Sequence, residues 1–174
     1  MRAPTRYRVC ALLAGWCLLA AAACAAKRTP ARALDDAPYD FAVHARVSAV
    51  RDWTDDTPIE LQPSHYILEP GGALRAATGP GAQDRYPPFV TRLQPHEVER
   101  LWRLIRDSGL LEEDNPIRVS ASEQFTIPGR TNAELVVTFQ GERWRFRTTL
   151  ESGTLESTAV RRIVNQLAAE AHVK

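Results

Sequence analysis

The stretch TRLQPHEVERLWRLIRDSGLL, residues 91–111, decides the fold because it specifies one helix together with both of its ends. Pro95 suits the first helical position, and Gly109 suits the left-handed residue that follows the last turn. Apolar residues recur at the helical spacing of three and four, which predicts a buried stripe of Val98, Leu101, Trp102 and Ile105. On the polar side, Glu99 lies four residues before Arg103, a spacing that predicts an ion pair.

Two pairs of strand-like segments precede and follow this helix. They are 65–68 with 74–78, across Gly71 and Gly72, and 134–139 with 143–150, across Gln140 and Gly141. Short alternating runs joined by glycine-containing turns are typical of antiparallel hairpins. The sequence therefore predicts two hairpins separated by a helix.

The remaining segments complete the expected fold. Residues 41–49 alternate between apolar and polar side chains, which predicts a strand with one buried face, and residues 89–93 predict a short strand. A last amphipathic helix is expected to begin near residues 154–157. Residues 112–132 predict a long loop, with a short strand near 125–127. The order of elements predicts an α+β fold, an antiparallel sheet of hairpins with two helices packed on one face.

The first 26 residues have the three parts of an export signal: a basic leader, an apolar segment and small residues at the exit. The segment resembles a bacterial lipoprotein signal peptide, because residues 21–23, all alanine, lead directly into Cys24. The resemblance implies that Cys24 is acylated and becomes the first residue of the mature chain. Ordinary cleavage within residues 20–22 and an uncleaved anchor over residues 9–26 are the two alternatives.

The cysteines favour the lipoprotein interpretation. All three lie in the leader, so that no thiol follows Cys24. A cysteine kept at the cleavage point of an exported chain has a reason to be there if it carries lipid. We therefore expect residues 1–23 to be a lipoprotein signal peptide, residues 24–38 a tether and residues 39–174 a single α+β domain.

The charge balance argues against nucleic acid as a partner. The precursor has 22 basic and 21 acidic side chains, and its leader contains three arginines and no acid. The mature chain therefore has a small negative net charge. Nucleic-acid-binding domains are usually strongly basic, so we expect no nucleic-acid partner.

The absence of known catalytic and metal-binding motifs predicts a protein that is not an enzyme. No phosphate-binding loop, dinucleotide fingerprint or zinc-protease motif is present, and we expect no cofactor and no metal. The four histidines are scattered along the sequence, and none has a cysteine partner after the leader. An enzyme with an unrecognised site would need a pocket that joins a histidine to an acid.

Two groups of residues are candidates for contact with a partner. Arg143, Arg145 and Arg147 alternate along one predicted strand, and Arg85 and Tyr86 lie in a proline-flanked loop. The arginines have the chemistry to bind a phosphate or a carboxylated glycan, although a charged outer face is also what an antiparallel sheet normally has. An exposed aromatic beside a cation is typical of contact surfaces.

Residues 91–111, read as x-x-L-x-P-x-E-x-x-x-L-W-x-L-I-x-x-S-G-L-L, followed by a hairpin and a terminal helix, resemble a set of small bacterial lipoproteins. More distantly, residues 66–171 are similar to the emfourin-type inhibitors of protealysin-like metalloproteases. The first resemblance implies a non-catalytic, lipid-anchored envelope protein that faces the periplasm or exterior, attached to the membrane through acylated Cys24 and able to bind an envelope protein. The second implies, as an alternative, an inhibitor of a secreted metalloprotease.

Overall fold

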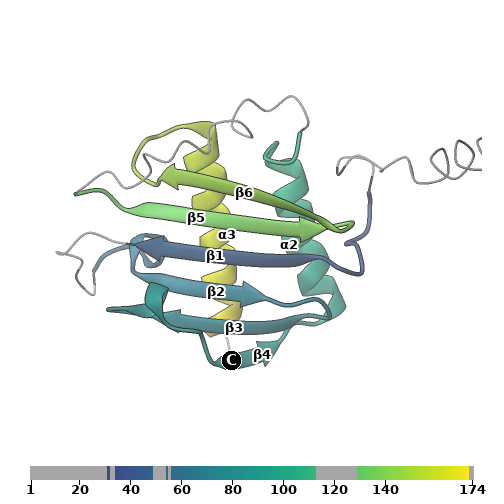
Figure 1. The fold of residues 1–174 in the computed structure, drawn as a ribbon, viewed down its shortest axis with the longest axis horizontal. Helices are drawn as coiled ribbons and strands as arrows, with labels where there is room; N and C mark the ends of the chain where they lie inside the picture. Colours follow the sequence, from purple (N-terminus) through teal and green to yellow (C-terminus); the bar gives the residue numbers. More distant parts are fainter. Residues whose placement is uncertain (1–30, 32–33, 49–53, 55, 113–128, 173–174) are drawn as a thin grey trace, which may run out of the picture.

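The fold was analysed in a computed structural model, which describes residues 31, 34–48, 54, 56–112 and 129–172 (Figure 1). Within these ranges, six strands form one antiparallel sheet in the order β4-β3-β2-β1-β5-β6. The strands are β1 (Ala42–Ser48), β2 (Ser64–Leu68), β3 (Ala73–Thr78), β4 (Phe89–Arg92), β5 (Asn132–Phe139) and β6 (Glu142–Thr149). Two single-turn helices, η2 (Ile59–Leu61) and η3 (Ala82–Asp84), lie in the connections.

Two helices cover one face of this sheet and leave the other face open (Figure 1). They are α2 (Pro95–Asp107) and α3 (Leu155–His172). This arrangement confirms the predicted α+β fold with both helices on one side. One connection is not a hairpin, since α2 carries the chain from β4 at one edge to β5 beside β1.

The core lies between the sheet and the helices. Trp102 on α2 is fully buried, with its ring centroid 5.2 Å from that of Phe41 and 5.4 Å from that of Phe139. Burial of a tryptophan side chain contributes about 4–6 kcal/mol of gross hydrophobic free energy. The predicted stripe is confirmed, because Leu101 and Ile105 are also fully buried and Val98 packs against the same cluster.

The polar side of α2 corrects one expectation. The predicted ion pair between Glu99 and Arg103 is wrong, because the Glu99 carboxylate accepts hydrogen bonds from the backbone N–H of Ala37 at 3.0 and 3.1 Å. Arg103 Nε donates instead to the backbone oxygen of Glu99, at 3.4 Å. A backbone amide brought to the helix by tertiary packing therefore takes the place of the predicted partner.

The turn between β5 and β6 has the geometry that matches the twist of a hairpin. Gln140 and Gly141 both have positive φ, 51° and 71°, as a type I′ turn requires. The carboxylate of Asp40 accepts hydrogen bonds from both turn amides, at 2.9 Å from Gln140 N and 2.6 Å from Gly141 N. The turn is thereby tied to the segment that enters β1.

Several sequence predictions lie outside the described residues. These are the signal peptide, Cys24, most of the tether and the short strand near 125–127. Among the residues that are described, no helix is long and apolar enough to cross a membrane.

Candidate functional site

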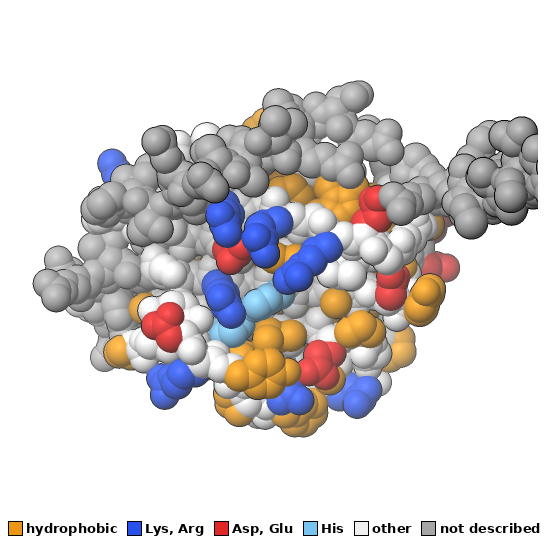
Figure 2. Space-filling view, in the orientation of Figure 1, with side chains coloured by type: hydrophobic (Ala, Val, Ile, Leu, Met, Phe, Trp, Pro, Cys, Tyr) orange, Lys and Arg blue, Asp and Glu red, His pale blue; other side chains and the backbone are white. Residues whose placement is uncertain are grey.

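The open face of the sheet carries two rows of side chains that cross the strands, and most of these side chains are polar. One row, from β2 to β6, is His65, Arg46, Glu134 and Arg147. The next row, in the same strand order, is Ile67, His44, Val136 and Arg145. Side chains two residues apart on a strand share a face, so both rows project away from the helices. We call His44, Arg46, His65, Glu134, Arg143, Arg145 and Arg147 the arginine–histidine face, and Figure 2 shows basic side chains gathered around the histidines there.

Positive charge exceeds negative charge on the arginine–histidine face, which has four guanidinium groups and one carboxylate. Glu134 Oε1 lies 3.1 Å from Arg145 Nε and 3.2 Å from Arg147 Nε. With the residues that the structure describes, the side chains of Arg46 and Arg143 form no hydrogen bond or ion pair. Like charges gathered on one face repel each other. An anionic partner would relieve this repulsion.

His44 and His65 meet on this face. Their Nε2 atoms lie 2.6 Å apart, and their rings stack with centroids 4.7 Å apart and planes inclined by 20°. The four histidines are scattered along the sequence, but strand register brings these two together. The two residues occupy diagonal positions on neighbouring strands, since His44 faces Ile67 and His65 faces Arg46.

The hydrogen bonds of the pair assign its tautomers. His65 Nδ1 lies 2.7 Å from the backbone oxygen of Arg85, which only accepts, so that Nδ1 carries the proton and Nε2 is bare. His44 Nε2 must then donate to His65 Nε2, which leaves the Nδ1 atom of His44 as an acceptor.

Both imidazoles are held in the neutral form. Burial, followed by the influence of His65 and Arg46, lowers the pKa of His44 to about 4, against a partial opposing effect of Glu134. Burial also lowers the pKa of His65 and outweighs its hydrogen bond to the Arg85 carbonyl. At neutral pH the pair is therefore uncharged, and the positive charge of the face comes from its arginines.

The second predicted contact group borders the same face. The backbone oxygen of Arg85 accepts the hydrogen bond from His65 Nδ1. The Nη2 atom of Arg85 donates to the backbone oxygen of Pro80 at 3.0 Å. Tyr86 is 69% exposed, and the guanidinium carbon of Arg75 on β3 lies 5.2 Å from its ring centroid. The structure thus brings the two predicted groups, far apart in the sequence, to opposite sides of the histidine pair.

A hollow of about 240 Å³ lies beside His44 on the open face. Ile67 and Val136 contribute apolar walls, Thr138 and Arg143 line it on the β5 and β6 side, and Glu69 lines it after the end of β2. Arg75 Nε donates to Glu69 Oε1 at 2.6 Å, which offsets the acidic charge. We call this hollow the His44 groove.

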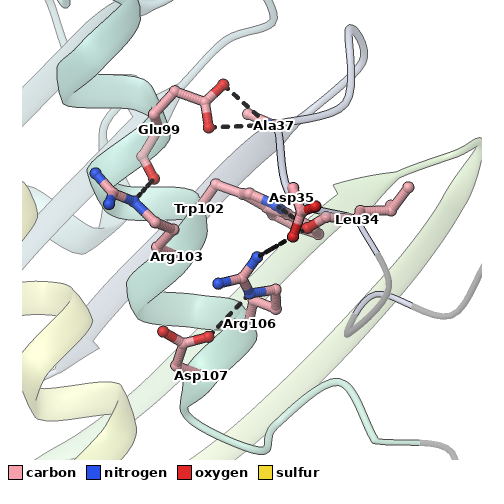
Figure 3. Close-up of polar contacts among 8 residues, drawn as sticks. All are labelled: Leu34, Asp35, Ala37, Glu99, Trp102, Arg103, Arg106 and Asp107. Atoms are coloured by element: carbon pink, nitrogen blue, oxygen red, sulfur yellow. Dashed lines mark hydrogen bonds and ion pairs between the residues drawn. The ribbon is translucent and has the colours of Figure 1, made fainter.

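Residues 34–37, the N-terminal strap, are fastened to α2 on the other layer of the molecule (Figure 3). The backbone oxygen of Leu34 accepts hydrogen bonds from Trp102 Nε1 at 3.3 Å and from Arg106 Nη1 at 3.0 Å. Arg106 also lies 3.7 Å from Asp35. The last part of the predicted tether is thus packed against the domain, and the strap leaves the arginine–histidine face uncovered because α2 lies on the opposite side of the sheet.

Beside the strap lies a second hollow, of about 390 Å³. Phe41, Leu93 and Val98 line it together with Tyr39, whose side chain is 90% exposed. Its walls are mostly apolar, and Arg92 and Glu99 also line it. This hollow has no cluster of titratable groups comparable to the arginine–histidine face among the residues that line it.

Sequence reasoning found the outer arginines but missed their neighbours. The alternation in residues 41–49 places His44 and Arg46 on the open face, which is a signal for their exposure but not for their partners. His65 and Glu134 join them only through strand register. In the described part of the chain, no group of three or more histidine, cysteine or acidic side chains is arranged to hold a metal ion.

Comparison with known proteins gives no relative for this chain: no family model matches it, and no curated protein matches it.

Proposed function

We propose that this chain is a non-catalytic, lipid-anchored protein of the cell envelope that binds an anionic partner through its arginine–histidine face. The observation that carries the proposal is the excess of positive charge on that face. The face has four guanidinium groups and one carboxylate, although the chain after residue 23 is slightly acidic as a whole. Such local complementarity favours specificity and fast association with an oppositely charged surface.

The strap supports attachment close to a membrane. If Cys24 carries lipid, only residues 24–33 separate it from the docked Leu34. Ten residues span at most about 35 Å when fully extended. The domain would then remain near the membrane surface, and its open face would stay free to meet other envelope components.

The histidine pair supports a binding role over a catalytic one. A histidine base is usually oriented by a carboxylate or carbonyl and directed at a nucleophile. Here the Arg85 carbonyl orients His65, but the Nε2 atom of His65 accepts a hydrogen bond from His44 and is not directed at a nucleophile. The acid in the His44 groove, Glu69, is engaged with Arg75. The groove therefore holds a histidine and an acid without joining them.

Capture of partners from native membranes tests the proposal. The full-length protein is compared with the double variant Arg46→Gln/Arg143→Gln and with Arg103→Gln/Arg162→Gln, which removes the same charge from the helices. We expect an anionic partner to be recovered with the unaltered protein and the helix variant, and at least tenfold less with the face variant. Equal recovery from all three would contradict the proposed surface.

The same preparation tests the anchor with Cys24→Ser. We expect this variant to lose lipid labelling and stable membrane association, because lasting attachment requires the acyl chains. A variant that stays on the membrane unchanged would contradict acylation. Recovery of a metalloprotease by the unaltered protein, with inhibition at near-equal amounts, would instead favour the inhibitor alternative.

A further inference from the structure

We propose that the His44 groove binds the free carboxyl terminus of a peptide whose last residues are small and apolar. The inference rests on the proposed function, because it names the chemistry of the partner that the arginine–histidine face takes. It joins three features of one hollow: a guanidinium, an unprotonated imidazole nitrogen and apolar walls.

Arg143 supplies the anion-binding group. Its side chain lines the groove and, among the residues that the structure describes, has no hydrogen-bond or ion-pair partner. A guanidinium presents N–H groups in a fork that matches the two oxygens of a carboxylate. Arg145 and Arg147, in contrast, already share the carboxylate of Glu134. The ligand carboxylate is therefore assigned to the Arg143 end of the groove.

His44 lines the same groove as that cation and supplies an acceptor. Its Nε2–H is used by His65, which leaves the Nδ1 lone pair available for a ligand donor. A ligand that matches an acceptor beside a guanidinium carries an N–H close to its anion. The last residue of a peptide has this combination, with an amide N–H one carbon away from the terminal carboxylate.

The walls and length of the groove define the side chains that fit. Ile67 and Val136 give an apolar surface, which favours aliphatic side chains. Lining residues from the end of β2 to β6 cover three strand spacings, or about 14 Å, the length of about four extended residues. The volume of about 240 Å³ leaves little space for large side chains.

The surroundings argue against phosphate as the ligand. Protein sites for phosphate commonly add backbone N–H groups from a helix N-terminus or a glycine-rich loop. Here Ala42, His44, Val136 and Thr138 lie on strands whose backbones pair with each other across β1 and β5. The groove thus offers side-chain donors from Arg143 and Thr138, which suit a monoanion better than a dianion.

Titration of the full-length protein in detergent with N-acetyl-Ala-Ala tests the proposal. The same peptide with a C-terminal carboxamide and inorganic phosphate are the comparison ligands. We expect the acid to bind at least tenfold more tightly than the carboxamide, and phosphate to compete weakly. Equal binding of the carboxamide would overturn the carboxylate assignment, and stronger binding of phosphate would overturn the peptide assignment.

Two variants locate the site. Arg143→Gln removes the guanidinium, and Thr138→Trp fills the groove from a partly exposed position on β5. Each is expected to weaken binding of N-acetyl-Ala-Ala at least tenfold without lowering the melting temperature by more than a few degrees, whereas Arg162→Gln on α3 should bind normally. Normal binding by both groove variants would overturn the proposal. If no peptide binds while membrane capture still depends on Arg46 and Arg143, this inference fails and the proposed function stands.

Discussion

Acidification is expected to destabilise this protein through His44. Burial lowers the pKa of His44 from 6.5 to about 4 in the folded chain. A histidine with a depressed folded pKa stays neutral in the native state while the unfolded chain takes up a proton. The stability it contributes is therefore present above pH 6.5 and is lost progressively as the pH falls from about 6.5 to about 4.

The size of the expected loss in free energy of unfolding follows from the change in the pKa of His44. Between pH 7.5 and 4.5, a histidine with these two pKa values contributes a loss of about 2.5 kcal/mol at most to the free energy of unfolding. His44 is only partly buried, so solvent screening reduces this figure to about 1–1.5 kcal/mol. His65, whose pKa is also lowered by burial, acts in the same direction.

The assay is urea unfolding of the unaltered protein and of His44→Gln at pH 7.5 and pH 4.5. Groups common to both proteins cancel in the comparison, so that the difference in pH dependence reports His44. We expect the unaltered protein to lose about 1–1.5 kcal/mol more than the variant. Parallel pH dependences, or an NMR titration of His44 with a midpoint near 6.5, would refute the buried pair.

Arg46 provides a second test of the same reasoning. Its charge is one of the causes that lower the pKa of His44. In Arg46→Gln we expect the NMR midpoint of His44 to rise, whereas Glu134→Gln should lower it because the Glu134 carboxylate acts in the opposite direction. An unchanged midpoint in both variants would show that these charges do not face the imidazole as described.

Three further predictions concern the strap, the β5–β6 turn and α3. Glu99→Gln weakens the charge-assisted bonds to the Ala37 amide, and we expect a loss of about 1–2 kcal/mol together with at least tenfold faster hydrogen exchange at Ala37; unchanged exchange would mean that Glu99 does not hold the strap. Asp40→Ala removes the acceptor of two turn amides and should cost about 1–3 kcal/mol in urea unfolding, with no loss arguing against the capped turn. Burial raises the pKa of Glu156 to about 7, so the stability that this residue contributes should be lost as the pH rises from 4.5 through 7. Glu156→Gln should be about 1–2 kcal/mol more stable than the unaltered protein at pH 8 and similar to it at pH 4.5, and a constant difference at both pH values would contradict this.

Elements that depend on local signals were predictable. The ends of α2 are specified by Pro95 and Gly109, and its buried stripe by the spacing of Leu101, Trp102 and Ile105. Both hairpins follow from short alternating segments around glycine-containing turns. These features need only neighbours in the sequence, which is why the fold class and the outward direction of the β6 arginines could be inferred.

Contacts between distant segments were not predictable in the same way. His44 and His65 are 21 positions apart and meet because of the register between β1 and β2. A shift of one residue in that register would turn one of them toward the core. Glu99 illustrates the same limit. Its spacing on the helix predicts an ion pair with Arg103, but in the fold its carboxylate accepts a hydrogen bond from the amide of Ala37, 62 positions away.

The fold also explains why the candidate site was recognised only in part. Arg143, Arg145 and Arg147 alone look like a charged outer strand, which many sheets have. The addition of Arg46, with only Glu134 to offset four guanidinium groups, makes the same residues a positively charged surface. The sequence contains each of these side chains, but the net charge of the face they form depends on the order of strands in the sheet.

Site-specific photo-crosslinking in the source cells tests the central claim most directly, because amine-reactive reagents would find lysine only at Lys27 and Lys174. A photo-reactive residue replaces the exposed Ser48 on the open face or the exposed Asn165 on α3. We predict a discrete adduct from position 48 that disappears at high salt and in the Arg46→Gln/Arg143→Gln background, and none from position 165. An adduct from position 165 alone would contradict the account. So would an adduct from position 48 that persists at high salt and in the Arg46→Gln/Arg143→Gln background.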